Sequence, residues 1–384
     1  MKIAYSVMDI GRLGGIERIT IAKANWMAAH GHDVFILNTL PTYPTRQSLK
    51  TDCTLDPSIK LISFSADYNQ CGKPLSWSWL KTKRMHLRKL QEFIDKEGPD
   101  IIVSASQIDG IPIQLVKRRS TKIVYESHTQ LRAIKGIDYS SALGWLAIKL
   151  KRLYIDILLG IKISRYIVLT KEDINHFVGN HKKISAIANP VCIDPIVSKG
   201  KNKIIISHGR LDSVKNYSEL IDAMSVITTR HPDWQLHIYG DGVLRDSLLQ
   251  QIEKKHLQSQ VKLMGITHNV PQVLSQADIF ASTSIIEGFP LSTLEAMACG
   301  LPIVSYRNAA CDEMIKQSRF GILCEINDIQ GLTSAILQLI EDAELRKELA
   351  SNALRMSQNY SRDTIFSMHE TIYRSITKQE TPRS

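Results

Sequence analysis

Strand-like runs that end at a glycine loop alternate with helical patterns along this chain, and the alternation begins again in the second half. The apolar run Ile3–Val7 leads through the loop 11–15 into a helical pattern over residues 16–30. The run Ile204–Ile206 leads in the same way through the loop 207–216 into another helical pattern. Strand–loop–helix–strand units form parallel sheets, which bind ligands at the carboxyl ends of their strands. The pattern therefore predicts an α/β protein with two Rossmann-like domains that face a central cleft.

The length of 384 residues also favours two domains. A polar segment, Lys199–Asn202, follows the loop that begins at Asn189 and separates the two series of alternating segments. Domain boundaries commonly fall in polar connections of this kind. We expect an N-terminal domain over residues 1–195 and a C-terminal domain over residues 196–359.

A hydrophobic content of 43% with 22% charged residues is that of an ordinary globular protein. The six cysteines include no Cys-x-x-Cys pair, so they indicate neither a zinc site nor a disulfide framework. The N-terminal strand lacks the features of a signal peptide, and no run of 18 or more apolar residues could span a bilayer. We expect a cytoplasmic location.

The net charge of +10 comes entirely from the first half of the chain. Residues 1–190 contain 28 Lys and Arg against 16 Asp and Glu, whereas residues 191–384 contain 20 against 22. This asymmetry suggests that the first half has an anionic partner, which could be a membrane surface, a nucleic acid or an acidic substrate. No recognised nucleic-acid-binding module is present, so a nucleic acid is the least favoured of the three.

A basic amphipathic helix is predicted in this half over residues 77–94, and it opens with Trp77 and Trp79. A helix of this kind can lie on anionic lipid, and a solvated surface helix is the alternative. The basic positions of the helix over residues 77–94 are Lys81, Lys83, Arg84, Arg88 and Lys89. A second basic, largely apolar stretch covers residues 145–162.

Two glutamates eight residues apart, Glu287 and Glu295, follow an apolar strand over residues 278–282. Gly288 and Pro290 indicate a loop between the strand and a helix. A helix start favours phosphate, whereas carboxylates placed there repel it, so the glutamates are better suited to accept hydrogen bonds from sugar and ribose hydroxyls. A capped surface helix with two solvated glutamates is the alternative.

Three further features follow predicted strands. Arg210 and Lys215 lie in one loop and could bind a diphosphate, or they could be two solvated cations. His128 follows the strand Lys122–Tyr125, where it could serve a site or simply be structural. The glycine loop 11–15 could approach an anion, but its spacing is not Gly-x-Gly-x-x-Gly and Asn38 replaces the usual acid, which weighs against an NAD-dependent oxidoreductase.

Together these segments resemble the retaining glycosyltransferases of family GT4, which have the GT-B fold. The resemblance is densest over roughly residues 204–325. Its motifs are Gly-Arg-Leu…Lys-Asn at 209–216, Ile-Tyr-Gly-Asp-Gly at 238–242 and the stretch 287–302, with Gly-Gly-Ile-Glu-Arg at 14–18 and Asn-Pro-Val at 189–191 in support.

The resemblance implies that the second domain binds a nucleoside-diphosphate sugar. Glu287 would bind hydroxyls of the donor sugar beside the backbone amides of residues 288–291, and Glu295 would bind the ribose hydroxyls. Arg210 and Lys215 would hold the diphosphate and stabilise the leaving group, which makes a metal ion or other cofactor unnecessary. No Asp-x-Asp metal motif occurs in the chain.

The resemblance also implies that His128 approaches the donor sugar near the reaction centre, and that the last helix, within residues 360–384, crosses back onto the first domain. One departure is the segment 310–313, which reads Ala-Cys-Asp-Glu where the family often has Gly-Pro-x-Glu. The remaining predicted donor-binding positions are Gly14, Gly15, Gly265, Gly288, Phe289, Pro290 and Leu291.

The predicted activity is the transfer of a sugar, with a UDP-linked donor favoured, to a lipid-linked or lipopolysaccharide-type glycan acceptor. The basic first domain would bind this acceptor at the inner face of the cytoplasmic membrane. The alternative is a catalytically silent subunit that binds a nucleotide sugar and acts through a partner.

Overall fold

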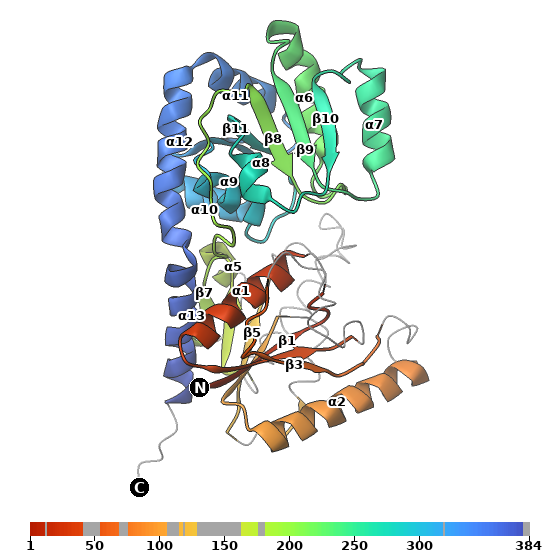
Figure 1. Cartoon of the computed structure of the whole chain (residues 1–384), viewed down its shortest axis with the longest axis vertical. Coiled ribbons are helices and arrows are strands. Elements are labelled where there is room, and N and C mark those ends of the chain that lie inside the picture. Colours follow the sequence, from red (N-terminus) through yellow and green to blue (C-terminus); the bar gives the residue numbers. More distant parts are fainter. Residues whose placement is uncertain are drawn as a thin grey trace. The chain divides into compact units, whose positions relative to one another are not determined.

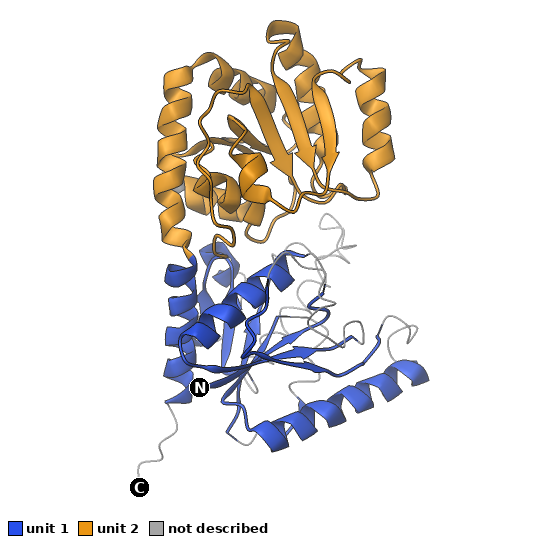
Figure 2. Ribbon diagram, viewed as in Figure 1, with its two compact units in different colours: residues 1–188, 362–384 blue, residues 189–361 orange. Residues whose placement is uncertain are grey.

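The structure is a computed structural model that describes residues 1–11, 14–40, 54–68, 76–105, 115–117, 120–128, 163–175, 181–317 and 319–378. It separates into two compact units, residues 1–188 with 362–384 and residues 189–361 (Figure 2). The second unit therefore begins at Asn189, whereas the sequence-based boundary followed residue 195. The predicted basic stretch 145–162 lies outside the described residues.

The first unit contains a parallel sheet with the strand order β3-β2-β1-β4-β5-β6-β7. Figure 1 labels β1, β3, β5 and β7 of this sheet. Its strands are β1 (Lys2–Val7), β2 (Asp33–Asn38), β3 (Lys60–Ser63), β4 (Ile101–Ser104), β5 (Lys122–Glu126), β6 (Arg165–Val168) and β7 (Ile184–Ala186). Its helices are α1 (Gly15–Ala29), α2 (Trp77–Glu97), α5 (Lys171–Ile174), the 3₁₀ turn η2 (His181–Lys183) and α13 (Arg362–Thr377).

The second unit contains a parallel sheet with the order β10-β9-β8-β11-β12-β13. Its strands are β8 (Ile204–His208), β9 (Gln235–Tyr239), β10 (Val261–Gly265), β11 (Ile279–Ser282), β12 (Ile303–Tyr306) and β13 (Gly321–Cys324). Its helices are α6 (Tyr217–Arg230), α7 (Arg245–Lys254), α8 (Val270–Leu274), α9 (Leu291–Ala298), α10 (Ala309–Gln317), α11 (Ile329–Glu341), α12 (Ala343–Ser357) and the 3₁₀ turn η3 (Gln358–Tyr360).

Two parallel sheets with helices in alternation confirm the predicted Rossmann-like α/β class. Every residue of β4, β11 and β12 is buried. Strands of a parallel sheet that are covered on both faces are apolar throughout, which explains the apolar runs in the sequence. In the second sheet the strand order reverses between β8 and β11, which pair with each other. Open parallel sheets bind ligands outside the carboxyl ends of the strands at such a reversal, so this edge is the place to look for a site.

The last helix, α13, belongs to the first unit although it lies at the other end of the sequence. It packs against α1, and the indole Nε1 of Trp26 donates a hydrogen bond to Asp363 at 2.7 Å. Its buried side chains include Phe366 and Tyr373, both 0% exposed. In the described part of the chain, no helix combines the length and hydrophobicity that a bilayer-spanning segment needs.

Candidate active site

Two loops meet at the carboxyl ends of β8 and β11. The first loop, residues 209–216, follows β8, and the second, residues 283–290, follows β11. The amide of Ile285 donates to the carbonyl of Val214 at 2.9 Å, and the Thr283 hydroxyl donates to the carbonyl of Lys215 at 2.8 Å. These hydrogen bonds fasten one loop to the other, so side chains that are 72 residues apart in sequence become neighbours.

Lys215 and Glu287 form an ion pair across these loops, with 2.6 Å between Nζ and Oε1. Their side chains are only 17% and 15% exposed. Burial, the largest single influence, lowers the pKa of Lys215, but the charge and hydrogen bond of Glu287 together with the charges of Tyr217 and Asp212 outweigh it, and the pKa is raised overall. Lys215 is therefore a fixed positive charge at neutral pH, as the predicted phosphate-binding role requires.

Gly209 makes room for this lysine. A Cβ atom at position 209 would lie 2.7 Å from Lys215 Cε and 3.0 Å from the hydroxyl oxygen of Tyr217. The backbone of Gly209 also has φ +154°, in a region that favours glycine. The two predicted loop cations differ in environment, because the side chain of Arg210 is 75% exposed and pairs with Asp212 at 3.1 Å.

Glu295 lies on α9 and is 0% exposed, with 3.5 Å between its Oε2 and Nε2 of His208 at the end of β8. The helix begins at Leu291, and no side chain caps its N-terminus. The loop before it is held in place by Asn189, whose amide donates to the carbonyl of Phe289 at 2.8 Å. The predicted residues Gly288, Phe289, Pro290 and Leu291 therefore connect the ion-paired Glu287 to the buried Glu295.

Close glycine contacts bring the neighbouring loops together. A Cβ at Gly240 would lie 1.9 Å from the carbonyl oxygen of Gly209, so only glycine permits this approach of the loops after β8 and β9. Gly265, at the end of β10, has φ +77° and accepts a hydrogen bond from the amide of Gly240 at 2.8 Å. Gly265 thus belongs to the same row of strand ends as the Lys215 loop.

Sequence reasoning missed two residues of this site, His208 and Tyr217. His208 ends β8 in the same way that His128 follows β5, so the rule applied to His128 would have found it. Tyr217, the first residue of α6, is 3% exposed, and burial raises the pKa of its hydroxyl to about 12. No pattern in the sequence distinguishes this tyrosine from an ordinary core residue.

The predicted residues of the first unit lie at two other places. Gly14 is the N-cap of α1 and Gly15 its first residue, and no side chain caps this helix. A Cβ at Gly14 would lie 2.2 Å from Oε2 of Glu17. His128 follows β5, with a side chain that is 6% exposed and 3.4 Å between its Nε2 and Oε2 of Glu126.

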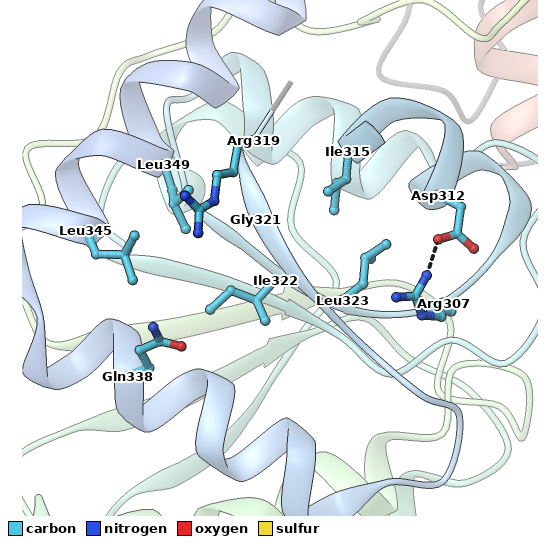
Figure 3. Close-up of a pocket in the computed structure, with 10 residues that line it drawn as sticks. All are labelled: Arg307, Asp312, Ile315, Arg319, Gly321, Ile322, Leu323, Gln338, Leu345 and Leu349. Atoms are coloured by element: carbon cyan, nitrogen blue, oxygen red, sulfur yellow. Dashed lines mark hydrogen bonds and ion pairs between the residues drawn. The ribbon is translucent and has the colours of Figure 1, made fainter. Parts of the chain in front are cut away.

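The segment that departs from the family pattern begins α10. Cys311 is 1% exposed and its amide donates to Asn308 Oδ1 at 2.9 Å, while Asp312 pairs with Arg307 at 2.6 Å. A cavity of about 410 Å³ adjoins Asp312 and extends along β13 toward Leu349 (Figure 3). Arg307 also pairs with Glu325 at 2.6 Å, so its charge is balanced by two carboxylates. Among the described residues, no group of three or more His, Cys, Asp or Glu could hold a metal ion.

Residues 193–356, nearly the whole second unit, match the family described as glycosyl transferases group 1. An uncharacterised glycosyltransferase of Haemophilus influenzae is 26% identical over 372 residues, which cover 95% of this chain and 97% of that protein. The second unit of this chain is a group 1 glycosyltransferase domain.

Another relative, from Escherichia coli, is the UDP-Gal:α-D-GlcNAc-diphosphoundecaprenol α-1,3-galactosyltransferase. It is 28% identical over 280 residues, which cover 67% of this chain and 71% of the relative. The structure also resembles that of Anabaena HepE in complex with UDP and glucose, with a TM-score of 0.74, 20% identity and coverage of 98% and 100% of the two chains. At this identity the likeness shows the fold, and it confirms the GT-B class.

Proposed function

We propose that this glycosyltransferase belongs to family GT4 and transfers a sugar with retention, without a metal ion, from a nucleoside-diphosphate sugar to a lipid-linked glycan acceptor. The observation that carries the proposal is the Lys215–Glu287 pair at the reversal point of the second sheet. A cation and a hydroxyl acceptor are adjacent there, and a nucleotide sugar needs both next to its diphosphate–sugar bond.

The chemistry follows from these charges. Breaking the sugar–diphosphate bond leaves negative charge on the diphosphate, and a lysine fixed in position stabilises that charge without reorganising. Arg210 lies five residues before Lys215 in the same loop, and its exposed guanidinium can add a second, forked contact to phosphate oxygens. In this proposal the two cations take the role that a metal ion has in other glycosyltransferases.

Glu287 and Glu295 would bind the two ends of the donor. Glu287 would accept hydrogen bonds from hydroxyls of the transferred sugar, next to the uncapped start of α9. Glu295 is buried beside His208 and would accept hydrogen bonds from the ribose. A UDP-linked donor is favoured, and the relationship to the Escherichia coli UDP-Gal-dependent galactosyltransferase supports both this donor class and a diphosphoundecaprenol-linked acceptor.

The proposal also gives the enzyme a peripheral location at the inner face of the cytoplasmic membrane. The charge of the first half and the exposed start of α2, where Trp77 is 80% exposed, support it. The acceptor would then be presented at the surface on which the enzyme docks.

The deciding experiment incubates the pure protein with a panel of nucleotide sugars and measures thermal stabilisation and release of the nucleoside diphosphate. We expect one donor to raise the melting temperature and to be turned over slowly when water replaces the acceptor. A donor that stabilises the protein without any release of product would favour the catalytically silent subunit. A panel with no stabilising nucleotide sugar would contradict both readings.

A further inference from the structure

Glu126 is a buried carboxylate around which three parts of the first unit meet. It ends β5 and is 3% exposed. Lys23, on α1 and 1% exposed, donates to both of its oxygens at 2.5 and 2.6 Å. Tyr373, on α13, donates its hydroxyl to Oε1 at 3.0 Å. The carboxylate thus joins helices from opposite ends of the sequence.

The two oxygens of this carboxylate face different groups. Oε1 faces α13, where His369 Nε2 lies 3.4 Å away in addition to the Tyr373 hydroxyl. Oε2 lies 3.4 Å from Nε2 of His128, which is an ion-pair distance rather than a hydrogen bond. Lys23 contacts both oxygens. A displacement of the carboxylate by α13 would therefore change its position relative to His128.

Stability alone is a poor explanation for this arrangement. Taking two charges out of water costs about as much as their attraction returns, and apolar residues of similar volume often replace a buried pair without loss. Burial raises the pKa of Glu126, but Lys23 and the two histidines outweigh burial and hold it well below its usual range. Glu126 is therefore a permanent negative charge beside His128.

We propose that Glu126 is a positioning residue that holds the His128 imidazole with its Nε2–H directed at the carboxylate, and that Lys23 and α13 keep Glu126 in place. This inference rests on the proposed function, in which His128 approaches the donor sugar. The partner of one ring nitrogen determines which tautomer an imidazole adopts, so the carboxylate leaves Nδ1 as the nitrogen that can accept a hydrogen bond.

α13 is attached to the rest of the unit by contacts that do not involve Glu126. The Trp26–Asp363 hydrogen bond is one, and His32 pairs with Glu370 at 2.8 Å. The His32–Glu370 pair provides a matched control, because it also joins α13 to the body of the unit but lies outside the Glu126 cluster.

The test uses the full chain and the double variant Lys23→Met with Glu126→Gln, which removes both buried charges and leaves neither unpaired. We expect it to fold, to keep the KM for the donor within about twofold and to lose about 10-fold or more in kcat. The control double variant, His32→Gln with Glu370→Gln, should keep kcat. The single variant Glu126→Asp keeps a carboxylate beside an intact Lys23. It should therefore retain a higher kcat than the double variant.

A second readout does not depend on activity. Nitrogen NMR of labelled histidine should show His128 as the Nε2–H tautomer in the parent protein and a mixture of tautomers in the Lys23→Met/Glu126→Gln variant. An unchanged tautomer and unchanged kcat would overturn the proposal, as would an equal loss of kcat in the control. If no donor is turned over by the parent protein, the proposed function fails, and the NMR comparison still decides the role of Glu126.

Discussion

The Nζ atom of Lys215 lies 2.6 Å from Oε1 of Glu287, so the two loops at the carboxyl ends of β8 and β11 carry one neutralised pair of charges. In the proposed mechanism, a diphosphate that binds Lys215 would compete with Glu287 for the same ammonium group. The carboxylate would then be released to accept hydrogen bonds from sugar hydroxyls, so this pair would couple the binding of the two parts of the donor.

Lys215→Met should abolish most of the transfer activity. The variant lacks the cation that stabilises the departing diphosphate, so kcat/KM should fall by about 100-fold or more. It also leaves Glu287 largely buried without its partner, which should cost about 2 kcal/mol of unfolding free energy. Steady-state kinetics and chemical denaturation measure the two effects.

The double variant Lys215→Met with Glu287→Gln serves as the control, because it removes both charges. It should regain most of the lost stability and none of the activity. Recovery of activity in the double variant would contradict the assignment of Lys215 to the leaving group.

The fold could be predicted because parallel sheets impose a simple pattern on the sequence. Runs such as Ile3–Val7 and Ile204–Ile206 are apolar throughout and end at glycine loops, and the structure has β1 and β8 there. The strand order depends on long-range pairing, which no local pattern records. The reversal between β8 and β11 therefore became visible only in the structure.

The sequence indicated which residues belong to the candidate site, but not which of them contact one another. Spacing identified Glu287 and Lys215 separately, but their contact depends on the two loop–loop hydrogen bonds from Ile285 and Thr283. Of the groups around Glu126, the sequence indicated His128 but not Lys23 or Tyr373, because these two are 350 residues apart in sequence and each looks like part of an ordinary amphipathic helix.

Glu295→Gln should weaken binding of a nucleoside diphosphate while leaving inorganic pyrophosphate unaffected. The residue is proposed to bind the ribose, which pyrophosphate lacks, and the amide replaces a charged acceptor at the same volume. We expect the dissociation constant for the nucleotide to rise about 10-fold, in keeping with the loss of about 1.4 kcal/mol from a charged hydrogen bond. Calorimetric titration with each ligand measures the difference, and an equal loss for both would place Glu295 near the phosphates instead.

Transfer activity should persist in the presence of a chelator. In the proposed mechanism Arg210 and Lys215 neutralise the diphosphate, so removing divalent ions should change kcat by less than about twofold. The assay compares the protein with excess chelator, with chelator followed by magnesium and with chelator followed by manganese. A loss of activity that manganese restores would contradict the role of the two cations.

Stability should fall between pH 6.5 and pH 4 because of His86 on α2. This side chain is 0% exposed, Tyr68 Oη lies 3.0 Å from its Nδ1, and burial lowers its pKa from 6.5 to about 4. As the pH falls, the unfolded chain takes up a proton first, so the unfolding free energy decreases across this window by about 3 kcal/mol. Denaturation curves of the parent and of His86→Gln should converge toward pH 4.

The exposed start of α2 provides the last prediction, on membrane binding. Trp77 is 80% exposed and Leu80 38% exposed, and the neighbouring side chains of Lys81 and Arg84 are also exposed. Two other cations of this helix are engaged within the protein: Lys89 donates to the carbonyl of Phe64 at 2.7 Å, and Lys83 lies over the ring of Trp79 at 5.0 Å. We therefore do not count Lys89 and Lys83 among the cations that α2 offers to a membrane.

The variant Lys81→Gln with Arg84→Gln should therefore lose binding to vesicles that contain anionic lipid. Each exposed cation near such a surface contributes about 1 kcal/mol, so the loss should be about 30-fold in the partition constant at low salt. Trp77→Ser should weaken binding further and at all salt concentrations, because its contribution is apolar burial. Lys201→Gln with Lys254→Gln, which neutralises two exposed lysines of the second unit, is the control. If this control loses as much binding as the α2 variant, net charge rather than the helix accounts for the attraction.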